Sequence, residues 1–299
     1  MTRRTSADYG SGVRLKARGL LQLWTLSAIF ASEGQWRHRA ATYGGRKMIE
    51  KDDKIKQDFV IESFSDEDTL RLYSNDTFNI GLWESEKLLV TKYFSKEGKI
   101  LDIGCGAGRT TIGLYKLGYK NTIGVDLTPS MIEEAIKNST KAGIKVHFQM
   151  GDACNLSFED ESFDSCLFSF NGIMQIPVKD NRIRALKEIH RVLKKDGIFI
   201  FTTHDREAGL EWKWFWDEEA ERWSKGEQDQ RIFEYGDRII EDRGRLIFLH
   251  FPNRKEVLDC LKESGLELVD EAWLSELVEE PEVVRKRVSN CKFWVAKKK

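Results

Sequence analysis

Short apolar runs alternate with amphipathic stretches over the middle of this 299-residue chain. Each apolar run is too short for a helix, and the stretch that follows it spaces its apolar residues as a helix does. The pattern predicts strands at 99–103, 121–126, 145–150, 163–169 and 197–203, with helices at 109–118, 129–142 and 180–194. Short strands separated by helices favour an α/β fold, in which helices cover both faces of a parallel sheet.

The ends of these helices carry local signals. Thr128 and Pro129 are a capping residue and a first-turn proline before the second helix. Gly118, Gly143 and Gly197 each follow a predicted helix, where glycine commonly ends the helix in a left-handed conformation.

The flanking segments have a different character. Before the sheet, a polar segment contains one short predicted helix at 66–74 and an amphipathic helix at 83–94. After residue 203, the pattern predicts a helix at 211–224, a hairpin of strands 232–240 and 245–251, a helix capped by Asn253 and ending at Gly265, and strands at 266–273 and 290–297.

These changes predict the domain organisation. The segment from about residue 208 leaves the sheet at the carboxyl ends of the strands, where ligands bind in open parallel sheets, so we expect it to form a lid. The predicted units are a leader at 1–47, a helical lead-in at 48–98, a core at 99–207, a lid at 208–251 and the rest of the core at 252–299.

Charge is distributed unevenly. Residues 1–47 hold nine Lys/Arg and two Asp/Glu, whereas the remainder holds 39 basic and 47 acidic residues, which argues against a nucleic-acid-binding surface. The leader has the composition of a transit peptide or a poor signal peptide, and it equally fits a segment added by cloning or upstream translation. We expect a cytoplasmic protein, or an organellar one if the leader is a transit peptide, without a membrane span.

A glycine-rich stretch follows the first predicted strand. Residues 99–109 read KILDIGCGAGR, which places Asp102 in the strand and glycines at positions 104, 106 and 108. Glycine lets a ligand lie against main-chain N–H groups, and the helix beginning near Arg109 points its positive end at the same place. The stretch therefore favours a loop that cradles a nucleotide-like molecule.

Acidic residues end the next two strands. Asp126 lies 18 residues beyond Gly108, where a carboxylate can accept hydrogen bonds from a ribose diol. Asp152 follows the third strand and is placed to accept from an adenine amino group. No His/Cys/acid cluster has the spacing of a metal site, and the five cysteines fit free thiols.

Together these residues resemble the class I S-adenosylmethionine-dependent methyltransferase family. The first motif of that family is similar to residues 101–108, and its second-strand and third-strand acids match Asp126 and Asp152. Residues 163–170 and 185–202 resemble its fourth strand and the helix and strand after it. The resemblance implies a Rossmann-like, doubly wound, mostly parallel seven-stranded sheet with an antiparallel last strand, here with an inserted helix-plus-hairpin lid.

The resemblance also implies S-adenosylmethionine as the cofactor. The backbone at 104–108 would hold its methionine part, Asp126 its ribose, and Asp152 with Ala153 its adenine, while Leu127 would pack on the adenine ring. Phe170 would border the sulfonium. The predicted cofactor-binding residues are Asp102, Gly104, Cys105, Gly106, Gly108, Arg109, Asp126, Leu127, Asp152, Ala153 and Phe170.

Candidates for the acceptor side follow the fourth and fifth strands. His204 would accept a proton if the acceptor enters protonated, although a structural role is an alternative. Asn171, Trp212 and Trp216 are predicted to line the acceptor pocket, although a tryptophan face at helical spacing more often packs in the core. Residues 169–172 stand where amino-methylating nucleic-acid enzymes carry Asn-Pro-Pro-Tyr, which argues against methylation of a nucleic-acid base.

We therefore expect a methyltransferase that acts by in-line displacement on a small-molecule acceptor. The acidic body and the lid favour a small ligand over a polynucleotide. A tRNA or protein acceptor is one alternative. An NAD(P)-dependent oxidoreductase is another, although Arg109 stands where a dinucleotide fingerprint needs its third glycine. A nucleotide-binding module without catalysis is a third, and the pattern carries no signal for the oligomeric state.

Overall fold

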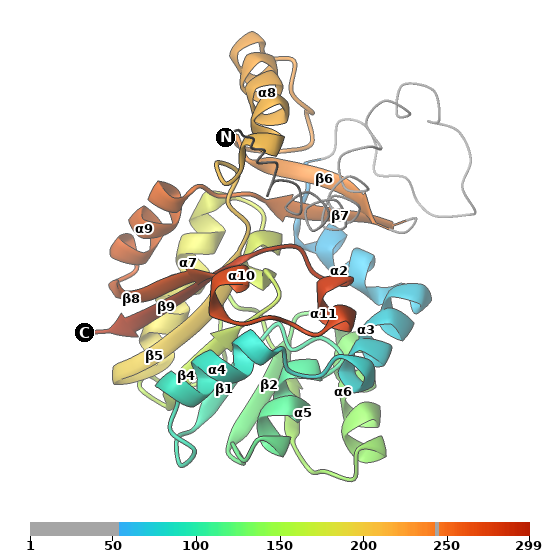
Figure 1. The fold of residues 1–299 in the computed structure, drawn as a ribbon, viewed down its shortest axis with the longest axis vertical. Coiled ribbons are helices and arrows are strands. Elements are labelled where there is room, and N and C mark those ends of the chain that lie inside the picture. Colours follow the sequence, from blue (N-terminus) through green and yellow to red (C-terminus); the bar gives the residue numbers. More distant parts are fainter. Residues whose placement is uncertain (1–53, 243–244) are drawn as a thin grey trace, which may run out of the picture.

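A seven-stranded sheet forms the centre of the molecule (Figure 1). It is seen in a computed structural model that describes residues 54–242 and 245–299, so the predicted leader lies outside the described residues. The strand order is β3-β2-β1-β4-β5-β9-β8. The strands are β1 (Ile100–Ile103), β2 (Thr122–Asp126), β3 (His147–Met150), β4 (Phe163–Phe168), β5 (Leu193–Thr203), β8 (Leu266–Trp273) and β9 (Lys292–Lys298). Strands β1 to β5 pair in parallel and β9 runs antiparallel to both neighbours, which confirms the predicted sheet.

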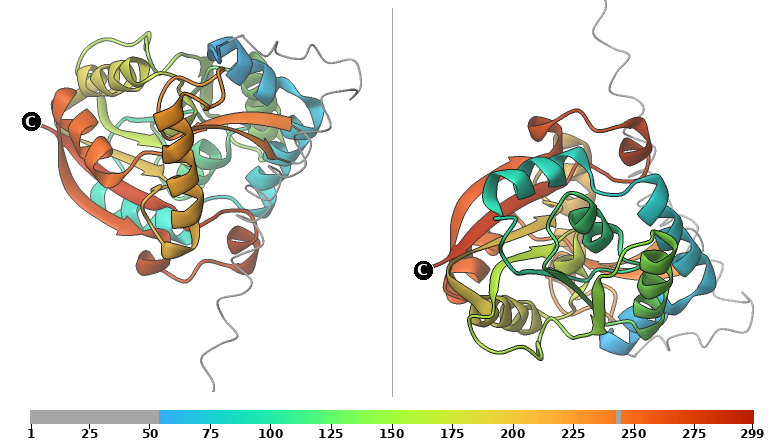
Figure 2. Two further views of the ribbon diagram at one scale, coloured as in Figure 1. Left: turned by 90° about the horizontal axis from the view of Figure 1, so that it is seen from above. Right: turned by 90° about the horizontal axis from the view of Figure 1, so that it is seen from below.

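Helices cover both faces because side chains alternate along buried strands (Figure 2). Phe199 and Phe201 of β5 belong to an apolar cluster that includes residues of α7 and α9, whereas Ile200 between them belongs to a second cluster with α4 and α5. The helices around the sheet are α4 (Glu84–Tyr93), α5 (Arg109–Lys116), α6 (Pro129–Lys141), α7 (Lys179–Val192) and α9 (Arg254–Glu263). This arrangement confirms the doubly wound fold.

Two local signals at the helix ends were interpreted wrongly. β5 begins at Leu193, so Gly197 lies inside the strand and does not end α7. Leu193 pairs with Phe163 of β4. The register of the two strands then shifts, and pairing resumes between Ser165 and Ile198. Thr128 is the residue before α6, but its side chain makes no capping hydrogen bond.

The lead-in contains three helices where the pattern predicted two. Helix α4 matches the helix predicted at 83–94, and α2 (Gln57–Ser65) and α3 (Glu67–Asn79) stand where only the helix at 66–74 is expected. Ile55 and Phe59 pack against Phe248 of strand β7, far along the chain. The Ser63 hydroxyl donates to the backbone carbonyl of Leu246, at 2.8 Å. These distant contacts, and not local propensity, hold α2 in place.

The inserted segment contains the predicted helix and hairpin. It consists of η3 (Leu210–Trp212), α8 (Lys213–Lys225), β6 (Asp237–Asp242) and β7 (Arg245–His250). The first hairpin strand begins at Asp237, five residues later than predicted. Figure 1 shows α8 and the hairpin stacked above the sheet. That this segment acts as a lid stays a prediction.

Buried ion pairs join the hairpin to the core. His250 is 1% exposed, and its two ring nitrogens lie 2.7 Å from Asp237 and 2.7 Å from Glu256 of α9. Arg182 of α7 pairs with Glu234, just before β6, at 2.8 Å. His250 therefore connects the hairpin to α9.

The end of the chain completes the sheet. The Asn253 side chain accepts a hydrogen bond from the Glu256 backbone N–H at 2.9 Å and caps α9 as predicted, and Gly265 ends that helix with a φ of +82°. Two short helices, α10 (Leu274–Leu277) and α11 (Glu282–Arg285), connect β8 to β9. Within the described residues, no helix combines the length and the apolar character needed to cross a membrane.

Candidate functional site

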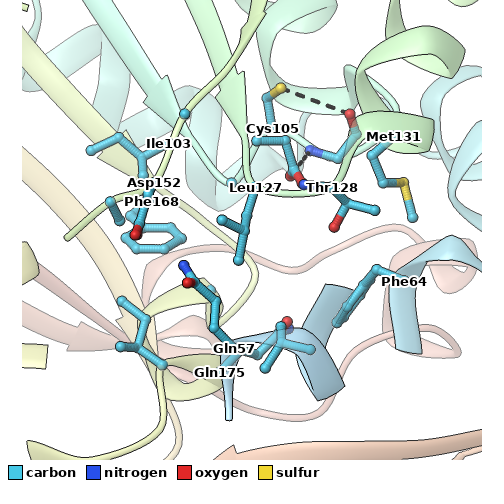
Figure 3. Close-up of a pocket in the computed structure, with 18 of the residues that line it drawn as sticks. Gln57, Phe64, Ile103, Cys105, Leu127, Thr128, Met131, Asp152, Phe168 and Gln175 are labelled. Atoms are coloured by element: carbon cyan, nitrogen blue, oxygen red, sulfur yellow. Dashed lines mark hydrogen bonds between the residues drawn. The ribbon is translucent and has the colours of Figure 1, made fainter. Parts of the chain in front are cut away.

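A cavity of about 430 Å³ lies at the carboxyl ends of β1, β2 and β4 (Figure 3). The strand ends and the glycine loop form one side, and α2 and α3 close the other with residues such as Val60, Phe64 and Tyr73. The predicted cofactor residues that line it are Gly104, Cys105, Gly106, Arg109, Asp126, Leu127, Asp152, Ala153 and Phe170. Asp102 and Gly108 do not line it.

The glycine loop takes a backbone path that L side chains rarely adopt. Gly104, Gly106 and Gly108 have φ values of +63°, +53° and +90°. A Cβ atom on Gly104 would lie 2.7 Å from the Phe168 ring, and one on Gly108 would lie 3.1 Å from the Phe148 ring. The absence of side chains therefore lets the loop pack on the sheet while its main chain faces the cavity.

Asp126 connects the loop to the second strand. One carboxylate oxygen accepts from the Gly106 N–H at 2.8 Å and the other from the Thr128 N–H at 2.9 Å. Burial raises the pKa of this carboxyl, against the effect of those hydrogen bonds. Asp126 also lines the cavity, so its carboxylate can be reached by a hydroxyl bound there.

The third strand end borders an apolar slot. Leu127 and Met131 line the cavity beside Asp152 and Ala153. One Asp152 oxygen accepts from the Cys154 N–H at 2.8 Å, which orients the side chain. A flat base fits between apolar side chains of this kind, with a carboxylate at its edge to accept from an amino group.

A buried ion pair supports the opposite end of the cavity. Both guanidinium NH groups of Arg109 contact the Glu86 carboxylate at 2.7 Å, and the guanidinium carbon lies 4.9 Å from the centre of the Trp83 ring. The Ser169 hydroxyl also donates to Glu86. Glu86 was missed by the sequence reasoning, although an acid on the buried face of the helix predicted at 83–94 is a signal that could have found it.

Asp102 lies behind the loop and is fully buried. One of its oxygens accepts from the hydroxyls of Thr110 and Thr111 at 2.5 and 2.6 Å. Burial raises the pKa of Asp102 to about 7, although the two threonine hydrogen bonds and Arg109 oppose the shift. Asp102 thus positions the start of α5, and its side chain does not line the cavity.

The turn after β4 separates this cavity from a second one. Phe170 and Asn171 have φ values of +51° and +59°. Phe170 lines the first cavity, whereas the Asn171 amide contacts the His204 ring at 3.1 Å and its backbone N–H donates to Thr202 at 2.7 Å. Asn171 lines neither cavity, contrary to the prediction for the acceptor pocket.

His204 and the two predicted tryptophans lie together at the second cavity. His204, Trp212 and Trp216 line a space of about 360 Å³ that does not include the predicted cofactor residues. Burial lowers the pKa of His204 to about 4, and its ring stacks on Phe251 with centroids 5.7 Å apart. That His204 accepts a proton from the acceptor stays a prediction.

Comparisons with known proteins agree with the fold. A family described as "Methyltransferase domain" matches residues 94–237. An uncharacterized methyltransferase, YcgJ of Bacillus subtilis, is 36% identical over 111 residues, which cover 36% of this chain and 41% of that protein. The uncharacterized protein MJ1252 of Methanocaldococcus jannaschii is 30% identical over 201 residues, covering 67% of this chain and 72% of that protein.

A solved structure shows the same fold. An S-adenosylmethionine-dependent methyltransferase from Methanosarcina mazei superimposes with a TM-score of 0.57 and 22% identity, covering 73% of this chain and 99% of that one. The chain spans only 46% and 41% of the length of two curated relatives, from Haemophilus influenzae and Bacillus subtilis.

S-adenosylmethionine fits the residues that line the first cavity. Gly104 and Gly106 bring main chain without side chains to the cavity, Asp126 lines it beside them, and the apolar slot formed by Leu127 and Met131 ends at Asp152. The strand order and the matched domain lead to one conclusion: the chain carries a methyltransferase domain with the fold of the S-adenosylmethionine-dependent methyltransferases.

Proposed function

We propose that this enzyme transfers a methyl group from S-adenosylmethionine to a small-molecule acceptor that binds in the first cavity beneath α2. The observation that carries the proposal is the closure of that cavity. Helix α2 lies across the strand ends and packs on the hairpin, so the space beside the cofactor residues is bounded on both sides. A bounded space of this size suits a small acceptor better than a polynucleotide.

The residues on the cofactor side of the first cavity would hold and orient S-adenosylmethionine. The backbone of residues 104–108 would bind the methionine part, Asp126 the ribose hydroxyls, and Asp152 with Ala153 the adenine. When bound, S-adenosylmethionine supplies a methyl group that is already activated by the sulfonium. The protein's task is then alignment and exclusion of water, and orientation of this kind can supply about 7–11 kcal/mol.

The acceptor half has a different lining. Figure 3 shows Phe64, Gln57 and Gln175 on the side of the cavity opposite Leu127 and Thr128. Val60 and Phe233 add apolar surface there. The two glutamine amides can donate and accept hydrogen bonds, so they would orient an acceptor that is largely apolar and carries a polar group.

Binding of the cofactor tests the first half of the proposal. Asp126→Ala should raise the Kd of S-adenosylmethionine at least tenfold, because hydrogen bonds to a charged group contribute about 1.5–3 kcal/mol each. Calorimetry of the purified chain measures this, with Glu133→Ala, an exposed acid of α6, as the matched control. Saturable binding of NADH without binding of S-adenosylmethionine or S-adenosylhomocysteine would refute the cofactor assignment.

Transfer of a labelled methyl group tests the second half. The enzyme should label compounds in a small-metabolite extract and leave purified tRNA and denatured or native protein fractions unlabelled. Incorporation confined to RNA or protein would reject a small-molecule acceptor while leaving the methyltransferase assignment intact.

A further inference from the structure

The second cavity has the chemistry of a separate binding site. Its volume of about 360 Å³ is comparable with that of the first cavity, and its walls include four aromatic side chains: Trp212, Trp216, Phe251 and Trp273. They come from η3, α8, the residue after β7, and β8, so distant parts of the chain converge on this space. The turn at 170–172 stands between the two cavities.

The aromatic wall is rigid. Trp216 and Phe251 are 7% and 4% exposed, and their ring centroids are 5.7 Å apart. Phe251 also stacks on His204, whose imidazole is neutral near pH 7 because burial lowers its pKa to about 4. The cavity therefore presents π faces, and the histidine beside them adds no positive charge.

The cations around this cavity already have partners. Arg206 lines it, but its guanidinium pairs with Glu256 at 2.7 Å and donates to the Phe251 carbonyl at 2.7 Å. Lys292, which lies over the Trp273 ring, pairs with Glu271 at 3.0 Å. Neither cation forms an ion pair with a carboxylate that lines the cavity.

Asp205 is the exception among the charged residues that line the cavity. Its carboxylate accepts from the Glu207 N–H at 2.9 Å, and among the described residues no basic side chain lies within ion-pair distance of it. Burial raises its pKa, against smaller opposing effects of the Glu207 hydrogen bond, Lys292 and Arg206. A half-buried carboxylate without a partner would gain from a bound positive charge.

We propose that this cavity binds a small organic cation, a quaternary ammonium or a protonated amine, with its charge facing Asp205 and its alkyl groups against the aromatic rings. Cations are attracted to the faces of aromatic rings, most strongly to tryptophan, and the attraction grows when water is excluded. The proposal is independent of the methyl-transfer function, because it rests on residues outside the cofactor cavity.

Choline and its neutral isostere 3,3-dimethylbutan-1-ol test the proposal by calorimetry. Choline should bind saturably with one site per chain, and the isostere should bind at least tenfold more weakly. Asp205→Asn keeps an oxygen for the Glu207 N–H but removes the charge, and it should raise the Kd of choline at least tenfold. Trp273→Leu removes an aromatic ring from another wall of the cavity, and it should also raise the Kd of choline.

Two controls locate the site. Asp217→Asn removes a carboxylate that pairs with Lys213 on the exposed face of α8, and it should leave choline binding unchanged. Asp126→Ala, in the first cavity, should leave it unchanged too. The proposal is overturned if choline does not bind, if the isostere binds equally well, or if Asp205→Asn and Asp217→Asn have the same effect.

Discussion

Gly104 is constrained twice, by its backbone conformation and by its neighbour. Its φ of +63° disfavours any residue with a side chain, and a Cβ atom would lie 2.7 Å from the Phe168 ring. Gly143, after α6, has a nearly equal φ of +67° but nothing within 4 Å of the same position. The two glycines therefore separate the cost of the conformation from the cost of the contact.

Gly104→Ala and Gly143→Ala should differ in cofactor affinity. Gly143→Ala should lower the free energy of unfolding by about 1–2 kcal/mol, the cost of a left-handed residue, and leave the Kd of S-adenosylmethionine unchanged. Gly104→Ala should cost more and raise that Kd at least tenfold, because Phe168 or the loop must move. Urea denaturation and calorimetry measure both quantities; equal Kd values for the two variants would contradict this account.

The site residues differ in how far the sequence could reveal them. Asp126 and Asp152 follow from strand ends and spacing, which are local signals. The environment of His204 depends on Phe251, Asn171 and the second cavity, and no local pattern around residue 204 encodes that burial. The local pattern therefore suggests a base at position 204 and carries no sign that the ring lines a cavity.

At the scale of elements, α2 connects the lead-in to the inserted hairpin. Phe59 is buried against Phe248 of β7, and the inner side of the same helix lines the first cavity through Gln57, Val60 and Phe64. Removing the hairpin would thus also remove the support of α2. Helix α2 therefore stands between the hairpin and the cavity.

Phe59→Ala should loosen α2 and weaken cofactor binding. Loss of a buried phenylalanine typically costs about 3–5 kcal/mol, and here the loss falls on one contact between two peripheral elements. We expect faster proteolysis within α2 and a several-fold higher Kd for S-adenosylmethionine. Limited proteolysis and calorimetry report the two effects, with Glu62→Ala, exposed on the same helix, as the control. Unchanged proteolysis would mean that the hairpin does not hold α2.

Element boundaries could be predicted where local signals decide them. The central strands and helices lie close to their predicted positions, because apolar periodicity and turn residues are encoded nearby. Helix α2 was missed because its apolar face meets a strand more than 180 residues away. β5 was predicted to begin too late because a bulge, and not Gly197, makes the connection from α7.

At the scale of the whole molecule, two buried carboxylates affect stability in opposite directions. Asp102 has a pKa raised by burial from 3.8 to about 7, so its favourable contribution is complete below pH 3.8 and is lost as the pH rises through 7. Burial also opposes ionisation of Glu256, but hydrogen bonds and charges from His250 and Arg206 hold its pKa near 2. Its contribution is present above pH 4.5 and is lost as the pH falls through 2.

Asp102→Asn should remove much of the decrease in the free energy of unfolding that the native chain shows as the pH rises. Asparagine keeps an oxygen for Thr110 and Thr111 but does not titrate, so the variant should lack the decline that the native chain shows between about pH 4 and 7. Urea denaturation at pH 5 and pH 8 measures the difference. Asp160→Asn, at an exposed carboxylate, should keep the native slope; the same slope in Asp102→Asn would contradict the assignment.

The hydrogen bond from the Gly106 N–H to Asp126, at 2.8 Å, joins the glycine loop to the end of β2 through a contact within the chain itself. The cofactor site is thus preorganised, and an adenosyl group entering it has little loop motion to freeze. The affinity for the adenosyl group then depends on the contacts that this group makes, because the conformational entropy of the loop was already lost when the chain folded.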